Sequence, residues 1–359
     1  MRNIFKNPLK MFFPKKIIGI DVGTSSVKVV EISRFSRGKT LENYGEIKSD
    51  SFYKEPLSDK QKGSYLHSND LISKTIRGIL DEAKIKTKAA IFSIPDFSTF
   101  CTSFDIPPMT EKEIPDAIRY NSSQYITLPI SEVTLDWQVL PNDPGDKNSS
   151  IRVFLVAVPN QVVQGYKTMA RLAGLQLYAL EAEALATTRA LVKNNKKTIC
   201  LIDIGVQSAN INIIDKGFLK KSYSFDFNSS QLSRVVSSTL GIGLGEAENI
   251  KNKEGLMHPG QDVVKALYLL IDPLLIEIKN ISAEFFQSEQ KQIEEIYLTG
   301  GTANLPGLKE YFAESLKKNV YVPNCFSEFS YPPILEQTLL KMSPSFSAAV
   351  GVALGGLET

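Results

Sequence analysis

Two stretches with the same pattern constrain the fold of this chain more than any other feature. Each has an apolar run that ends in Asp-x-Gly, then a few small or polar residues, then a second apolar run; they span residues 17–32 and 198–214. The pattern predicts a β-hairpin with a small-residue tip rather than a strand that feeds a helix. Such a tip points several backbone N–H groups into one concavity, which suits phosphate oxygens. Two related hairpins therefore predict a two-lobed α/β chain that clamps a polyphosphate.

Four residues of these hairpins carry the predicted chemistry. Asp21 and Asp203 end the first strand of each hairpin, and we expect them to face each other and to hold Mg²⁺ through water. Gly23 is expected to adopt the positive φ of a tight turn. Lys28, on the strand that leaves the first hairpin, is expected to contact a β-phosphate as a point charge. The alternative for Lys28 is an exposed strand lysine.

A third glycine-rich loop follows an apolar strand at about residues 296–299. It contains Gly300 and Gly301, and Pro306 lies where a helix is expected to begin. A loop of this composition brings backbone close to a flat ligand. Three such loops in this order indicate a nucleotide site more strongly than any one of them.

Three charged side chains on predicted helices have two interpretations each. Glu183 could position an attacking water, and the alternative is an exposed helical glutamate. Glu248 and Lys251 lie three residues apart on one helical face and could flank a ribose. A solvated helix face would explain this pair equally well.

Composition excludes several classes of protein. The chain has 359 residues, which is too long for a single core. Lys plus Arg is 41 and Asp plus Glu is 39, so the net charge of +2 argues against nucleic-acid binding. Cys101, Cys200 and Cys325 share no metal-binding spacing, which fits a reducing compartment. No apolar run reaches the roughly 20 residues of a membrane helix, so we expect a cytoplasmic protein.

The chain is expected to divide into two lobes, an insertion and an arm. The predicted parts are an N-terminal arm (1–16), a first lobe (17–94, 166–195 and 340–359), an inserted module (95–165) and a second lobe (196–339). The arm is basic and apolar, so it could contact an anionic membrane surface. Alternatively, it is a terminus whose apolar residues pack on the domain. Residues 180–193 and 346–354 are predicted helices, and the small residues of the second suit close packing on the first lobe.

The motifs support a resemblance that covers residues 17–357. The three loops resemble the two phosphate motifs and the adenosine motif of the actin-like (ribonuclease H-like) ATPase fold shared by actin, Hsp70 and sugar kinases. Within the insertion, residues 104–109, 125–133 and 135–140 resemble the PilM family of type IV pilus assembly proteins, which are relatives of FtsA. The resemblance implies an inserted SHS2-type α+β subdomain.

Membership of that family would imply a specific role. Its proteins bind ATP with Mg²⁺, show weak or no ATPase activity, and lie in the cytoplasm peripheral to the inner membrane. They dock the cytoplasmic N-terminal tail of a bitopic PilN-like partner between the first lobe and the insertion, and the pilus motor ATPase is a further candidate partner. The implied phosphate ligands are Asp21, Gly23, Thr24, Ser25, Ser26, Lys28, Asp203, Gly205, Val206, Gln207 and Ser208, and the implied ribose and adenine ligands are Glu248, Lys251, Gly300, Gly301, Thr302 and Asn304.

One departure and two alternatives accompany the resemblance. The chain has Ala209 where the family has a threonine, which predicts one lost γ-phosphate contact. One alternative is an FtsA-like polymerising membrane anchor. The other is a small-molecule kinase of the same fold, for which the insertion offers no obvious pair of substrate-site carboxylates.

Overall fold

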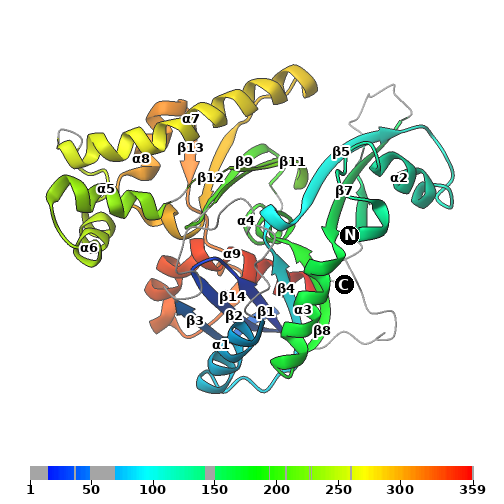
Figure 1. Ribbon diagram of the computed structural model, residues 1–359, viewed down its shortest axis with the longest axis horizontal. Helices are drawn as coiled ribbons and strands as arrows, with labels where there is room; N and C mark the ends of the chain where they lie inside the picture. The colour runs from blue at the N-terminus through cyan, green and yellow to red at the C-terminus, as the bar shows by residue number, and fades with distance from the viewer. Residues whose placement is uncertain are drawn as a thin grey trace.

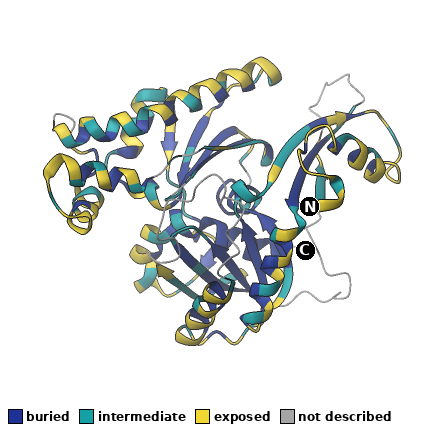
Figure 2. Ribbon diagram, viewed as in Figure 1, coloured by how far each residue is buried: buried dark blue, intermediate teal, exposed yellow. Residues whose placement is uncertain are grey.

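Three β-sheets organise this computed structural model (Figure 1). The structure describes residues 15–35, 38–48, 69–141, 150–193, 195–206, 208–225, 227, 229–258 and 261–357. The strands of the two larger sheets form the buried centre of the molecule, and exposed residues concentrate on the outer helices (Figure 2).

The first sheet has the strand order β14-β3-β2-β1-β4-β8. Its strands are β1 (Lys16–Val22), β2 (Ser26–Phe35), β3 (Gly38–Lys48), β4 (Ala89–Ile94), β8 (Gln176–Ala182) and β14 (Phe329–Ser330). β1, β2 and β3 form an antiparallel meander, and β4 runs parallel to β1. Helices α1 (Asn69–Glu82) and α3 (Asn160–Leu172) pack against this sheet through apolar faces.

The second sheet repeats this arrangement with the order β11-β10-β9-β12-β13. Its strands are β9 (Thr198–Ile204), β10 (Ala209–Asp215), β11 (Phe218–Phe225), β12 (Glu295–Thr299) and β13 (Asn319–Tyr321). β9, β10 and β11 form the meander, and β12 runs parallel to β9 as β4 does to β1. A separate core joins this sheet to α5 (Ser230–Leu240), α6 (Leu244–Glu254), α7 (Asp262–Glu289) and α8 (Leu308–Leu316). The predicted repeat of the hairpin unit is therefore confirmed.

Two helices pack between the large sheets, namely α4 (Glu183–Leu191) and α9 (Glu336–Leu357). Close approach explains the small residues of α9. A Cβ added at Gly351 would lie 1.9 Å from the carbonyl oxygen of Ala186 in α4, and one at Gly19 of β1 would lie 2.0 Å from that of Ala349. The prediction that this helix returns to the first lobe is confirmed, although it begins at Glu336 rather than near residue 346.

The third sheet has the order β5-β7-β6 and belongs to the inserted segment. Its elements are β5 (Phe100–Ile106), α2 (Ile114–Ser122), β6 (Val133–Val139) and β7 (Ile151–Pro159). The central strand β7 alternates between two cores: Val153 and Leu155 pack with α2, whereas Phe154 and Val156 join the core of the first lobe. This alternation fixes the insertion against the first lobe.

Two parts of the sequence-based prediction are wrong. Residues 180–193 are not one helix, because Leu180–Ala182 end β8, which pairs in parallel with β4, and α4 begins only at Glu183. Residues 329–330 fall in the range predicted for the second lobe, but they form β14 on the edge of the first sheet. In both cases pairing with a distant strand decides the structure. Among the described residues, no helix is long and apolar enough to cross a membrane.

Candidate functional site

The tip of the first hairpin is a three-residue loop between paired strands. Val22 pairs with Val27, and the Gly23 N–H donates to the Ser26 carbonyl oxygen at 3.0 Å. Gly23 does not have a positive φ, so that prediction is wrong. Glycine is favoured here by space, because a Cβ would lie 3.3 Å from the Ser26 carbonyl oxygen. Thr24 and Ser25 lie partly exposed at the tip, with Ser26 buried behind them.

Lys28 lies beside Asp21 rather than in open solvent. The Lys28 Nζ is 3.4 Å from Asp21 Oδ2, and the Lys28 side chain is only 13% exposed. Ser93 of β4 donates from Oγ to Asp21 Oδ1 at 2.7 Å. Burial lowers the pKa of Lys28, but the charges of Asp21, Glu46 and Glu183 outweigh burial and the pKa is raised. Lys28 is thus held as a cation at the base of the first hairpin, and the exposed-lysine alternative is wrong.

The second hairpin and the third loop meet at Asp203. The Gly205 N–H donates to the Ser208 carbonyl oxygen at 2.9 Å, as Gly23 does to Ser26. Gly300 has φ +84°, and a Cβ there would lie 2.4 Å from Asp203 Oδ1, so only glycine fits this position. Val206 and Ser208 lie partly exposed at the tip, whereas Gln207 lies outside the described residues.

Four acidic side chains lie close enough for their charges to act on one another: Asp21, Asp96, Glu183 and Asp203. Burial raises the pKa of Glu183 well above its ordinary value, and Asp21, Asp203 and Asp96 raise it further. Burial and the charges of Asp96 and Asp21 raise the pKa of Asp203 to about 7. Glu183 is the first residue of α4 and faces these acids, so the exposed-glutamate alternative is wrong. Within the described ranges, no three His, Cys, Asp or Glu side chains are placed to hold a metal ion directly.

Asp96 is a site residue that the sequence analysis missed. It follows Pro95 at the end of β4, and its Oδ1 accepts the Ala184 N–H of α4 at 3.0 Å. Because β1 and β4 are parallel, their carboxyl ends meet at one edge of the sheet, which places Asp96 near Asp21. An acid directly after a predicted buried strand was the signal that could have identified it.

The predicted ribose and adenine ligands lie on α6 and around the third loop. Glu248 accepts both Lys251 Nζ, at 2.9 Å, and the Ser233 hydroxyl. Burial raises the pKa of Glu248, but the hydrogen bonds lower it by more than burial raises it. The net pKa is lowered, so the carboxylate is charged. Lys251 is only 10% exposed, which does not fit a simple solvated face. The Asn304 Nδ2 donates to the Lys341 carbonyl oxygen at 2.7 Å. Gly301 and Thr302 begin the short 3-10 segment that Asn304 ends.

Ala209 is the first residue of β10 rather than part of the phosphate loop, where the sequence analysis expected it. It pairs with Ile204 and Phe225 in the second sheet, and its side chain is fully buried in the apolar core with Ile211. By strand alternation, the next residue, Asn210, lies on the opposite face with its register partner Asp203. A hydroxyl at position 209 would face the core, so the inference of a lost phosphate contact is wrong.

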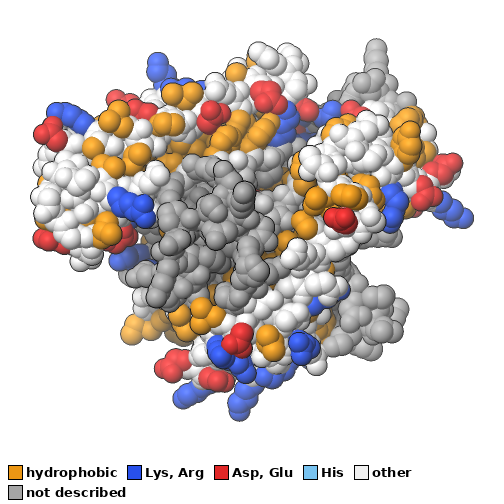
Figure 3. Space-filling view, viewed as in Figure 1, with side chains coloured by type: hydrophobic (Ala, Val, Ile, Leu, Met, Phe, Trp, Pro, Cys, Tyr) orange, Lys and Arg blue, Asp and Glu red, His pale blue; other side chains and the backbone are white. Residues whose placement is uncertain are grey.

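An apolar groove of about 310 Å³ lies between the first lobe and the insertion. The β1–β2 tip contributes Val22, Gly23 and Thr24 to its wall. The remaining lining residues come from α1, α3, the segment that leads into β5, and the insertion: Ile72, Val162, Tyr166, Met169, Pro95, Phe97, Ser98, Thr99, Phe100, Ile126, Thr127, Leu128, Val133, Ala157 and Pro159. The insertion also presents hydrophobic side chains on the face in Figure 3, near its border with the first lobe. The groove thus shares residues with the first hairpin tip.

Comparison with known proteins identifies the family. A family model described as "Type IV pilus assembly protein PilM" matches residues 19–357. The chain belongs to the PilM family. The cell division protein FtsA of Enterococcus faecalis is 22% identical over 350 residues, covering 86% of this chain and 78% of that protein. The predicted family and its relationship to FtsA are confirmed.

Solved structures confirm the actin-like α/β fold. A structure titled "PilM-PilN type IV pilus biogenesis complex" matches with a TM-score of 0.80 and 21% identity, covering 96% of this chain and all of that one. A more distant structure is the ethanolamine utilization protein EutJ from Carboxydothermus hydrogenoformans, with a TM-score of 0.54 and 19% identity, covering 97% of this chain and 92% of that one.

Proposed function

We propose that this PilM-family chain is an ATP-binding scaffold of a type IV pilus assembly platform, and that it docks the cytoplasmic tail of a PilN-like membrane protein. The observation that carries the proposal is the apolar groove between the first lobe and the insertion. A preformed concave site lined mainly by aliphatic and aromatic side chains suits an extended peptide with apolar anchors. Such docking would hold the chain peripheral to the inner membrane through its partner.

The side chains and backbone groups of the two hairpins fit a nucleotide with Mg²⁺. Lys28 provides a buried cation, and the two hairpin tips provide backbone N–H groups for phosphate oxygens. Asp21 and Asp203 would hold the cation through its water shell, since Mg²⁺ keeps several waters and favours carboxylates. The cation would neutralise phosphate charge. Thr24, Ser25, Ser26, Val206 and Ser208 would bind phosphate beside it.

The third loop and α6 would bind the nucleoside. Gly300 and Gly301 would let backbone approach the ligand. The charged Glu248–Lys251 pair of α6 would contact ribose. Glu183 would orient a water at the start of α4. Burial and the neighbouring carboxylates raise the pKa of Glu183 well above its ordinary value. We propose that hydrolysis is slow or absent.

The test is a titration of a synthetic peptide of the PilN-like partner's N-terminal tail against the full chain, with and without Mg-ATP. Saturable one-to-one binding in at least one state supports the scaffold. Absence of binding in both states contradicts it.

An FtsA-like polymerising role is a second candidate, because the match to FtsA extends over 350 residues. High-speed sedimentation with Mg-ATP would detect filaments. A chain that stays in the supernatant at every concentration argues against this candidate.

A further inference from the structure

The carboxylate of Asp96 has no role in the proposed nucleotide site, although the parallel pairing of β1 and β4 places it near Asp21. The residue is only 6% exposed. Its Oδ1 accepts the Ala184 N–H, and its Oδ2 is buried with no hydrogen-bond partner in the described part of the chain. Buried polar atoms are nearly always hydrogen-bonded, so an unpaired carboxylate oxygen calls for an explanation.

The surroundings of Asp96 make this isolation more costly. Its charge acts on both Glu183 and Asp203, so the three carboxylates lie near one another. Lys28 is the cation that acts on both of those acids, and its nearest acid is Asp21. The charged side chains around the proposed triphosphate site are therefore more often negative than positive. Like charges at close range in a poorly hydrated site repel strongly.

The N-terminus of α4 orients the Asp96 side chain. Ala184 N–H is one of the first N–H groups of α4, which have no partner within the helix. Its hydrogen bond to Asp96 Oδ1, together with the helix dipole, favours a carboxylate at this point. The same bond fixes the direction of the side chain and leaves Oδ2 without a partner among the described residues.

We propose that Asp96 makes nucleotide binding depend on a divalent cation. The ionised carboxylate repels a metal-free triphosphate, whereas a cation bound with the phosphates supplies a hydrated partner for the free Oδ2. Contact through water is consistent with the lack of a direct metal-binding cluster among the described residues. Asp96 is thus a specificity-determining residue that selects Mg-nucleotide over free nucleotide. This inference rests on the proposed nucleotide site.

The test compares dissociation constants for ATP with excess MgCl₂ and for ATP with EDTA, measured by calorimetry at pH 8. Asp96→Asn removes the charge but keeps an oxygen that can accept the Ala184 N–H. Removing one like charge within about 10 Å at an effective dielectric constant near 20 should tighten binding of metal-free ATP by about tenfold. Binding of Mg-ATP should not tighten.

The matched control is Asp116→Asn, which makes the same change of net charge at an exposed position on α2. It should leave both constants unchanged. An unchanged ratio of the two constants in Asp96→Asn overturns the inference while the nucleotide site stands. If the wild-type chain binds neither form, the nucleotide site itself fails and the inference with it. If Asp96→Asn does not fold, Asp96→Ser keeps an acceptor for Ala184 and must show the same change in the ratio.

Discussion

Lys28 and Asp21 lie directly across the first hairpin from each other, with Nζ 3.4 Å from Oδ2 and both side chains largely withdrawn from solvent. The distance is longer than that of a strong charged hydrogen bond. Asp21 also accepts the Ser93 hydroxyl. The Lys28 ammonium group has three donors and uses one of them on Asp21, so it retains donors for another anion. This geometry suits a lysine that contacts phosphate rather than one that only stabilises the fold.

Replacing Lys28 by Met should therefore weaken Mg-ATP binding by at least roughly tenfold, the loss expected for one charge-assisted contact. Calorimetric titration of the variant measures the loss. Lys16→Met is the control, because Lys16 lies on the neighbouring strand β1 and pairs with Glu42 at a more exposed position. Equal affinity in Lys28→Met and wild type would contradict the phosphate role.

The stability of the nucleotide-free chain should depend on pH through Asp96. Burial raises the pKa of Asp96 from its ordinary value of 3.8 to about 7, and the Ala184 hydrogen bond partly offsets this rise. Between these two values the folded chain keeps a proton that the unfolded chain has lost, so this group makes the fold less stable as pH rises towards 7. Asp96→Asn removes the effect. Its advantage in free energy of unfolding over wild type should grow by roughly 2 kcal/mol between pH 5 and pH 8.

Urea unfolding of both chains at the two pH values measures this difference. Comparing the variant with wild type cancels the other titrating groups. A difference that stays constant, or that shrinks as pH rises, would show that the fold does not raise the pKa of Asp96.

Gly351 sets the spacing between α4 and α9. Since a Cβ there would lie 1.9 Å from the Ala186 carbonyl oxygen, Gly351→Ala should force the helices apart and cost about 2–3 kcal/mol of stability. Gly245 of α6 has open space around it, so Gly245→Ala should be neutral or slightly stabilising. Thermal unfolding distinguishes the two, and similar melting temperatures would refute the packing argument.

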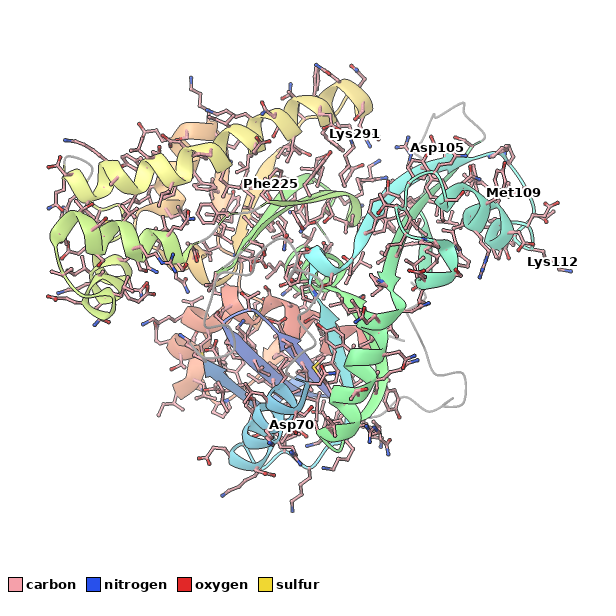
Figure 4. All side chains as sticks on the ribbon, viewed as in Figure 1. Asp70, Asp105, Met109, Lys112, Phe225 and Lys291 are labelled. Atoms are coloured by element: carbon pink, nitrogen blue, oxygen red, sulfur yellow. The ribbon has the colours of Figure 1, made fainter. Side chains whose placement is uncertain are left out.

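Arg152 joins the insertion to the second lobe. It donates from Nη1 to both oxygens of Glu289, at 2.8 and 2.9 Å, and also pairs with Asp105. Figure 4 shows Asp105 and Lys291 on the two sides of this junction. A double-mutant cycle of Arg152→Met and Glu289→Gln should give a coupling of about 1 kcal/mol, since both groups are partly exposed. The exposed pair Lys265–Asp262 should give a smaller coupling, and the reverse order would argue against a fixed junction.

Local patterns predicted the parts of the site that depend on local geometry. The Asp-x-Gly hairpins appear at both predicted places because alternating apolar residues and small tip residues define a hairpin without help from distant segments. The third loop follows its strand for the same reason, and the need for glycine at position 300 is explained by contact with Asp203.

Distant pairing decided what the sequence could not predict. Residues 176–182 contain Leu and Ala, which suit a helix as well as a strand, and only their pairing with β4 selects β8. The two residues of β14 are too few for any periodic signal. Asp96 became a site residue only because the parallel alignment of β1 and β4 places it near Asp21. The prediction for Ala209 failed because the direction of its side chain depends on strand register.

The predicted arm at residues 1–16 lies outside the described residues except for its last two, Lys15 and Lys16. Membrane contact by this segment therefore stays a prediction. Deleting residues 1–14 and measuring co-sedimentation with anionic vesicles would test it. Unchanged co-sedimentation would exclude the arm as the anchor.

The central claim, that the groove between the first lobe and the insertion docks the partner tail, is tested most directly by a pair of matched groove and surface variants. Leu128 lines the groove and is 41% exposed, whereas Leu269 lies exposed on α7, far from it. In titrations with the tail peptide and Mg-ATP, Leu128→Glu should weaken binding at least roughly tenfold, because a charge replaces an apolar contact. Leu269→Glu should bind as wild type does. Equal affinity of the two variants would contradict the account.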